Sequence, residues 1–345
     1  MKTLLYAASA LAVGALLSQT AIAQERTLYV GAYGGSTETL MKERVIPAFE
    51  AAHNVRIEYV AGNSTENLAR LQAQQGAQEL DVVILDDGPM YQAMALGFCG
   101  QLGELPNMAD VYDLARIGDT AVGIGVVATV FGYNTKIFEE NGWDPPSSWM
   151  DLTDERFARR LAIPPISNTY GLHTLIMMAR LQGGGESDID PGFEFLASEV
   201  APNVLAFEPS PGRMSELFQN EEIVLAVWGS GRLTSLQDTG FPVGIAYPEE
   251  GGVALMITGC PIAESENIEL ARAFLNYLLE PEVQADFAAT QGFGPVNRTV
   301  ELEEEVAVRV PYGPEQIENL VAVDWDVVNE KRQEWTRRWA REIER

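Results

Sequence analysis

The chain has 345 residues, and its 50 acidic and 23 basic side chains give a net charge of −27. This excess of acid excludes nucleic acid as a partner, because contacts with phosphates need clustered lysine and arginine. After removal of an N-terminal leader, about 320 residues remain, which exceeds the roughly 250–300 served by one hydrophobic core and predicts two lobes.

The N-terminus has the features of a secretory signal peptide. Lys2 supplies the positive charge, residues 4–17 form an uncharged apolar run, and Ala21 and Ala23 provide the small residues for cleavage after position 23, before Gln24. The alternative is a membrane anchor, but the run is shorter than the ~20 residues of a spanning helix. No cysteine stands at the cleavage site, and no later run is apolar enough to cross a bilayer. We therefore expect a soluble protein in the periplasm.

Short strands alternate with amphipathic helices at the start of the mature chain. Strands are expected at 27–30, 55–60 and 81–85, one helix carries Leu40, Val45 and Phe49, and another spans 66–75. Such alternation predicts a parallel sheet with helices on both faces. Ligands of these sheets bind beyond the carboxyl ends of the strands. The loops at 33–36 and 86–88 should therefore lie on one rim.

A long β-rich run at 122–133 contains three glycines and suits a strand that leaves one lobe for another. Beyond it we expect helices at 151–160, 171–181, 192–199, 214–219 and 268–279, strands at 204–207, 223–228 and 253–257, a return of the chain near 246–248, and a charged C-terminal helix at 323–345 with three tryptophans. These elements predict a second α/β region followed by a return to the first.

Four stretches of the sequence are similar to motifs of a known family. They are 133–135 (YNT), 146–152 (PSSWMDL), 247–252 (YPEEGG), and a closing segment that includes 269–279, 281–284 (PEVQ) and 292–297 (GFGPVN). In this order they resemble the periplasmic solute-binding proteins of the polyamine, iron and organic-solute class, the bacterial extracellular solute-binding superfamily. The resemblance covers nearly the whole mature chain.

The resemblance implies an α/β, two-lobed periplasmic-binding-protein fold of type II, with a ligand cleft between lobes joined by two crossing strands. The implied boundaries are 1–23 for the signal peptide, 24–122 and 251–309 for lobe one, 123–250 for lobe two, and 310–345 for a C-terminal helical segment that packs on one lobe. Such proteins close on a solute by a hinge motion.

The resemblance also implies a function: a monomeric receptor, without a cofactor, that delivers a small solute to an inner-membrane ABC permease. A receptor for chemotaxis or signalling would share the same fold and cleft. The sequence does not separate these two roles, because only the protein partner differs.

Two polar loops precede predicted helices, one in each lobe. Their candidate ligand-binding residues are Tyr33, Gly34 and Ser36 in lobe one, and Asn168, Thr169 and Tyr170 in lobe two. Free N–H groups at a helix start suit an anionic group of a ligand. The alternative is an ordinary turn in each case.

Other candidates are charged or aromatic. Asp86 and Asp87 follow a buried strand, and either can hold an ammonium, although Asp87 is equally suited to cap the next helix. Trp228 offers an aromatic wall and Arg232 a planar fork for a carboxylate or phosphate. Glu250 on the return strand is suited to an amine or to solvent.

The sequence differs from the family at positions that restrict which class of ligand is expected. Polyamine receptors of this class have an aromatic and an acid shortly after the glycines, whereas residues 253–257 are wholly apolar here. Iron receptors use adjacent tyrosines, but this chain has no such pair and only two histidines, His53 and His173, so no metal is expected. We expect an amino-acid derivative, a carboxylate or a zwitterion. A polyamine such as spermidine or putrescine is the alternative.

A secreted hydrolase is the rival class, and it lacks a convincing nucleophile. Ser230 lies between two glycines, but Trp228 takes the first glycine position of a nucleophile elbow, so no catalytic residue is assigned. Cys99 and Cys260 either form a disulfide in the oxidising periplasm or remain two buried thiols.

Overall fold

The computed structural model describes residues 26–344, and the signal peptide predicted from the sequence lies outside them. None of the described helices combines the length and the apolar composition needed to cross a lipid bilayer.

The strands form one mixed sheet. They are β1 (Arg26–Ala32), β2 (Val55–Ala61), β3 (Val82–Asp86), β4 (Arg116–Ile117), β5 (Ala121–Asn134), β6 (Leu161–Ile163), β7 (Val204–Phe207), β8 (Leu225–Gly229), β9 (Val243–Ala246) and β10 (Val253–Pro261). Their order is β2-β1-β3-β10-β5-β8-β6-β7, and β4 and β9 also pair with β5. The first three strands are mutually parallel, as are β6, β7 and β8, whereas β5 and β10 run antiparallel to their neighbours.

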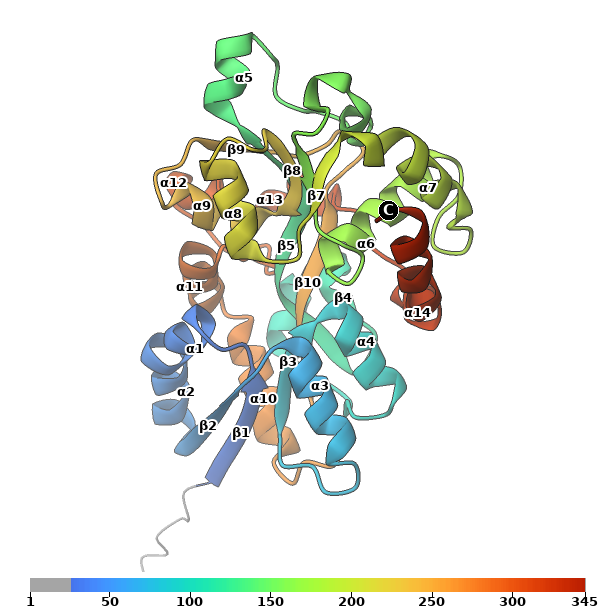
Figure 1. Cartoon of the computed structure of the whole chain (residues 1–345). Coiled ribbons are helices and arrows are strands. Elements are labelled where there is room, and N and C mark those ends of the chain that lie inside the picture. The colour runs from blue at the N-terminus through green and yellow to red at the C-terminus, as the bar shows by residue number, and fades with distance from the viewer. Residues whose placement is uncertain (1–25, 345) are drawn as a thin grey trace, which may run out of the picture.

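Helices cover both faces of this sheet (Figure 1). They are α1 (Ser36–Leu40), α2 (Ile46–His53), α3 (Ser64–Ala73), α4 (Asp87–Ala95), α5 (Thr135–Asn141), α6 (Thr169–Leu181), α7 (Asp190–Phe195), α8 (Pro211–Gln219), α9 (Ser230–Gln237), α10 (Ile268–Leu278), α11 (Pro281–Gln291), α12 (Glu304–Ala307), α13 (Gly313–Glu318) and α14 (Trp325–Glu342). One π-helical turn, Met41–Val45, joins α1 to α2.

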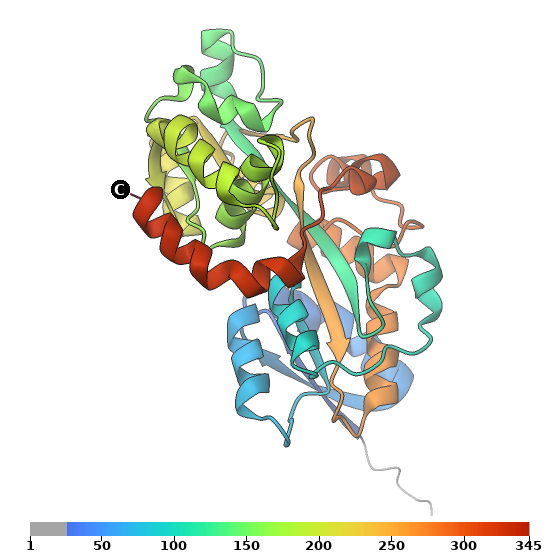
Figure 2. The same ribbon diagram turned by 90° about the vertical axis from the view of Figure 1, so that its right-hand side faces the viewer.

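Two lobes are stacked along β5 and β10, which pass from one to the other (Figures 1 and 2). The first contains β1, β2 and β3 with α1 to α4 and α10, and the second contains β6 to β9 with α5 to α9. This confirms the fold class and the two crossing strands. The exact lobe boundaries stay a prediction, because buried side chains form a continuous core from the first lobe along β5 to α8 and α9.

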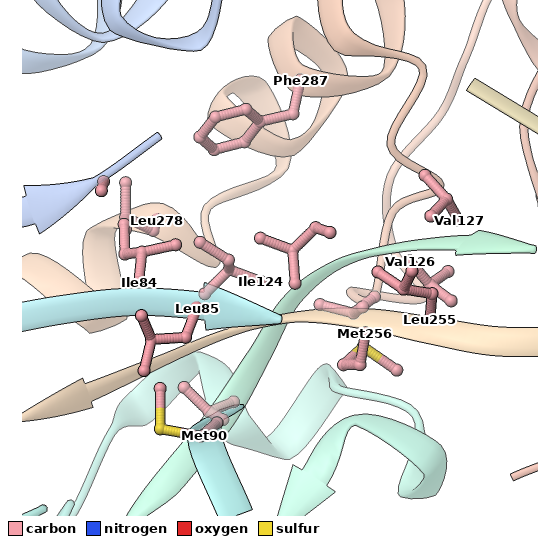
Figure 3. Packing of buried hydrophobic residues seen from close by; sticks show 14 of the residues in the cluster. Ile84, Leu85, Met90, Ile124, Val126, Val127, Leu255, Met256, Leu278 and Phe287 are labelled. Atoms are coloured by element: carbon pink, nitrogen blue, oxygen red, sulfur yellow. The ribbon is translucent and has the colours of Figure 1, made fainter. Parts of the chain in front are cut away.

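The middle of the sheet is packed on both faces, as Figure 3 shows. Ile84 and Leu85 follow each other in β3, so their side chains point to opposite faces. Phe287 of α11 covers one face and Met90 of α4 the other, and all four side chains are buried. The first lobe is therefore held against the base of the crossing strands by apolar contacts.

The run at 122–133 is confirmed as a crossing strand, but its glycines serve close packing. A Cβ on Gly132 would lie 2.1 Å from Cδ2 of Leu233, so a side chain at this position would force Leu233 to move. Leu233 belongs to α9, which packs here against β5. The absence of a side chain brings α9 close to the crossing strand.

The helix predicted at 151–160 is wrong. Two 3₁₀ turns, Trp149–Thr153 and Glu155–Phe157, occupy this region. The carboxylate of Asp154 accepts a hydrogen bond from the backbone N–H of Arg156 at 2.8 Å and so caps the second turn. Short polar side chains that bond to the nearby backbone compete with the α-helical ladder, which explains the break.

The C-terminal helix α14 contacts both lobes, whereas the sequence predicted packing on one. Asn329 donates to the carbonyl of Gly88 in the first lobe at 3.1 Å, and Arg338 pairs with Asp190 of α7 in the second at 2.5 Å. Trp339 is buried in the second lobe against the ring of Phe207. Figure 2 shows the helix lying across the junction of the lobes.

Cys99 and Cys260 form a disulfide, with their Cα atoms 5.6 Å apart. Of the two alternatives considered for the cysteines, a disulfide or two buried thiols, the structure therefore contains the disulfide. The bond links the segment after α4 to the end of strand β10, and both lie within the predicted first lobe.

Candidate functional site

A cleft of about 920 Å³ lies between the lobes, beside the crossing strands. Most residues predicted from the sequence line it: Tyr33, Gly34, Ser36 and Asp86 from the first lobe, and Asn168, Thr169, Tyr170 and Arg232 from the second. Its volume is near the upper end of the ~300–1,000 Å³ usual for small-molecule sites. A small solute would therefore leave room for the lobes to approach each other.

The topology explains why these residues meet. Each polar loop follows the carboxyl end of a strand, and helices α1, α3, α4, α6 and α9 all begin beside the cleft. In α6, Asn168 caps the helix by accepting from the N–H of Tyr170 at 2.9 Å. Several helix starts directed at one cleft favour a ligand with negative charge.

The loops after β1 and β3 share one rim, as predicted. The hydroxyl of Tyr33 donates to Oδ1 of Asp86 at 2.6 Å, and Tyr59 donates to the carbonyl of Tyr33 at 2.5 Å. The backbone N–H of Asp86 donates to the hydroxyl of Ser64 at 3.0 Å. Tyr33 therefore holds the carboxylate of Asp86 at the cleft wall, while Tyr59 fixes Tyr33 and Ser64 fixes the backbone of Asp86.

The electrostatics of Asp86 combine burial with positive charge. Burial raises the pKa of this carboxyl, while the hydrogen bond from Tyr33 and the guanidiniums of Arg232 and Arg332 act in the opposite direction. Burial also raises the pKa of Tyr33 well above its usual range, so its hydroxyl keeps the proton that it donates. The carboxylate of Asp86, bound by the hydroxyl of Tyr33, is thus influenced by two cations of the cleft.

Arg232 enters the cleft from the second lobe, on the first turn of α9. Burial raises the pKa of Tyr170, and the nearby guanidinium of Arg232 opposes that shift. A Cβ on Gly229 would lie 2.2 Å from the hydroxyl of Tyr170, so only glycine lets the tyrosine pack there. The helix start, the tyrosine and the arginine therefore form one wall.

Arg332 lines the cleft from α14 and was missed in the sequence analysis. Residues 325, 328, 332, 335 and 339 share one face of this helix by their spacing, and all except Arg332 are buried apolar side chains. An arginine in an otherwise apolar stripe is the signal that could have identified it. Burial lowers the pKa of Arg332, and Asp87 and Asp86 oppose that shift.

Three predicted residues do not line the cleft. Asp87 is buried behind it, where its carboxylate accepts from the N–H groups of Gly88 and Met256 at 3.0 and 3.2 Å. It follows the N-cap of α4, which is Asp86, so the capping alternative is also wrong for Asp87.

The other two are Trp228 and Glu250. Trp228 is a buried core residue of β8, because its position in the strand points the ring away from the cleft and into the core. Glu250 accepts from the hydroxyl of Ser148 and the backbone N–H of Trp149, and so fixes the turn at the entry to the second lobe.

Several polar residues of the cleft went unpredicted, among them Asn63, Gln92, Ser167 and Gln291. Asn63 caps α3 reciprocally with Glu66, a spacing that is visible in the sequence. The hydroxyls of Ser36 and Thr37 both donate to Gln291, at 3.0 and 2.9 Å, so this predicted loop is tied to the end of α11.

His173 is a buried residue of the core. His173 is fully buried, its Nδ1 lies 2.7 Å from the hydroxyl of Thr129, and burial together with Arg332 and Arg180 lowers its pKa to about 3. Its imidazole is therefore neutral. Among residues 26–344, histidine, cysteine and carboxylate side chains form no cluster of three that could hold a metal ion.

Comparisons with known proteins agree with this geometry. Residues 44–310 match the family described as bacterial extracellular solute-binding protein. The spermidine/putrescine-binding periplasmic protein of Salmonella typhimurium is 28% identical over 178 residues, covering 49% of this chain and 47% of that protein. The alignment thus spans about half the length of that relative.

Two further comparisons cover most of the chain. The gamma-aminobutyric acid-binding protein of Pseudomonas aeruginosa is 22% identical over 90% of this chain and 89% of that protein. A crystal structure of an ABC transporter from Clostridium perfringens superposes with a TM-score of 0.83 at 25% identity, covering 92% of this chain and 99% of that one.

Proposed function

The chain belongs to the bacterial extracellular solute-binding protein family, and we propose that it is a periplasmic receptor that captures a small zwitterion or carboxylate for an ABC importer. One observation carries the choice of solute: Arg232, Arg332 and Asp86, the cleft carboxylate that is not paired with an arginine, line the same cleft. Arg232 would take a carboxylate of the solute, and Asp86 its ammonium.

A zwitterion matches this arrangement better than a polycation. Neither Arg232 nor Arg332 has a carboxylate within ion-pair distance in the described part of the chain, so both guanidiniums are available to an anion. The same two charges repel a second ammonium. The relative that binds gamma-aminobutyric acid, itself a zwitterion, aligns over most of this chain and supports the same choice.

A polyamine remains the alternative solute in the same role. Its support is the spermidine/putrescine-binding relative, whose alignment covers about half of each protein. Asp238 pairs with Arg309, so Asp86 alone would then have to serve several ammonium groups, which the charge of the cleft disfavours.

A binding role also fits Ser230, the residue considered as a nucleophile. Its side chain is buried, and its hydroxyl accepts a hydrogen bond from the backbone N–H of Ala128 at 3.1 Å. This hydrogen bond fixes the start of α9 against β5. We infer that the solute leaves the cleft chemically unchanged. The proposal includes secretion by the N-terminal leader and action as a monomer.

Substitution of Arg232 tests the proposal. We expect Arg232→Ala to weaken binding of 4-aminobutyrate at least about tenfold, because an unpaired carboxylate in a desolvated site costs 2 kcal/mol or more. Isothermal titration of the mature protein with 4-aminobutyrate, putrescine and spermidine measures this. Arg213→Ala is the matched control, because Arg213 lies on α8 of the same lobe and outside the cleft.

Unchanged affinity in Arg232→Ala would remove Arg232 from the site. Tight binding of a polyamine, with no binding of the amino acid, would establish the alternative. A candidate solute recovered in altered form would indicate the hydrolase class.

A further inference from the structure

Arg332 is distinguished from the other arginines of α14 by its surroundings. Arg338 pairs with Asp190 and Glu342, and Arg337 is exposed to solvent. Arg332 is half-buried between Trp325 and Trp335 of the apolar stripe, and it lines the cleft. A charge is costly at such a position unless something compensates it.

The described residues provide that compensation only in part. Asp86 and Asp87 are the carboxylates whose charge acts on Arg332, and neither lies within ion-pair distance of it. Both oxygens of Asp87 already accept backbone N–H groups, from Gly88 and Met256. Burial raises the pKa of Asp87 to about 7, so its negative charge is incomplete at neutral pH.

The charged side chains that line the cleft carry a net positive charge. Asp238 and Arg309 pair with each other at its edge and cancel. Arg232, Arg332 and Asp86 remain, which leaves one positive charge in excess. A solute with one ammonium and one carboxylate would satisfy Asp86 and Arg232 and leave Arg332 without an anion.

From this placement we propose that Arg332 is a specificity-determining residue that binds a second negative charge of the solute. The inference rests on the proposed function. The preferred solute then carries one ammonium and two negative charges, as an acidic amino acid or an aminoalkyl phosphonate does. Its ammonium pairs with Asp86, and its two anionic charges are shared between Arg232 and Arg332.

The orientation of α14 supports this assignment. Asn329, one turn before Arg332, accepts from Gln92 at 3.1 Å and donates to Gly88, and both partners belong to α4. One turn after Arg332, Trp335 is buried in the second lobe. The helix is thus fixed on both sides of the arginine, which holds the guanidinium at the cleft before a solute arrives.

Two matched pairs of solutes test the proposal by isothermal titration. Glutamate and 4-aminobutyrate differ by one carboxylate, and 2-aminoethylphosphonate and β-alanine differ in the charge of one acidic group. We expect the wild type to bind at least one dianionic member about tenfold or more tighter than its partner. The pair that shows the preference distinguishes the two solute classes.

Arg332→Gln should abolish this preference, because the affinity for the dianionic member falls by about tenfold or more while that for the monoanionic partner falls less. Arg332→Lys keeps the charge without the planar fork and should retain part of the preference. Arg337→Gln, on the exposed face of the same helix, is the control and should behave as the wild type. Circular dichroism verifies that each variant is folded.

Equal or weaker binding of both dianionic solutes by the wild type would overturn the proposal, and so would an unchanged preference in folded Arg332→Gln. In both cases binding of 4-aminobutyrate or β-alanine would leave the proposed receptor function standing. Absence of binding by all four compounds would count against both proposals.

Discussion

Asp86 and Asp87 are adjacent in sequence, but the turn from β3 into α4 gives them different environments. Asp86 ends the strand and faces the cleft, where Tyr33 holds one of its oxygens. Asp87 begins the helix and is buried, with backbone N–H groups as partners. One residue of offset therefore separates a candidate ligand-binding carboxylate from a structural one.

The raised pKa of the Asp87 carboxyl should make the stability of the fold depend on pH. Burial raises the pKa of its carboxyl from 3.8 to about 7, so between these values the folded state holds a proton that the unfolded state has lost. Stability must then fall as pH rises through this window. Between pH 5 and pH 8 the free energy of unfolding of the wild type should fall by about 2 kcal/mol more than that of Asp87→Asn.

Urea denaturation of both proteins at the two pH values measures this difference. Asp119→Asn is the control, because Asp119 is exposed and should leave the wild-type pH dependence unchanged. Parallel pH profiles for the wild type and Asp87→Asn would show that Asp87 does not titrate in this window.

The sequence predicted the cleft residues that follow strands, because the carboxyl ends of parallel strands meet at one edge. It could not show on which face of the sheet the side chain of Trp228 lies. Strand β8 is buried on both faces, so its sequence has no alternation of polar and apolar residues to distinguish them. Glu250 was equally ambiguous, because its partners Ser148 and Trp149 are about 100 residues away in sequence. Long-range partners of this kind are not encoded in local patterns.

At the scale of elements, hydrophobic periodicity located most strands and helices to within a few residues. It failed at 151–160, where Asp151, Thr153 and Asp154 bond to the nearby backbone and produce 3₁₀ turns. The sequence placed three tryptophans on the C-terminal helix, but it did not show which parts of the protein these tryptophans pack against. The contact with both lobes, and with it the role of Arg332, appears only when the helix is seen in the fold.

The disulfide is an element-scale restraint on the first lobe. It closes a loop with a sequence separation of 161 residues, so its loss frees much of the unfolded chain. We expect replacement of both cysteines, Cys99→Ser with Cys260→Ser, to lower the free energy of unfolding by about 2–4 kcal/mol. Urea denaturation measures the loss, and wild type reduced with dithiothreitol should reach the same value. Equal stability of the oxidised and reduced wild type would contradict this role.

At the scale of the whole molecule, the lobes meet through β5, β10 and α14 (Figure 2). The cleft is lined by residues of both lobes. A cleft of about 920 Å³ is large for a solute with one ammonium and one or two acidic groups. Full contact with such a solute requires the two lobes to approach each other, as in hinge closure. The three charges of the cleft that have no ion-pair partner, Asp86, Arg232 and Arg332, lie on both lobes and on α14, so a bound solute would draw these parts together.

Small-angle X-ray scattering of the mature protein, with and without the solute identified by titration, tests this picture most directly. Closure of the lobes on the solute predicts a smaller radius of gyration when the cleft is occupied, in the wild type and not in Arg232→Ala at the same solute concentration. An identical scattering profile with and without a saturating solute would contradict it.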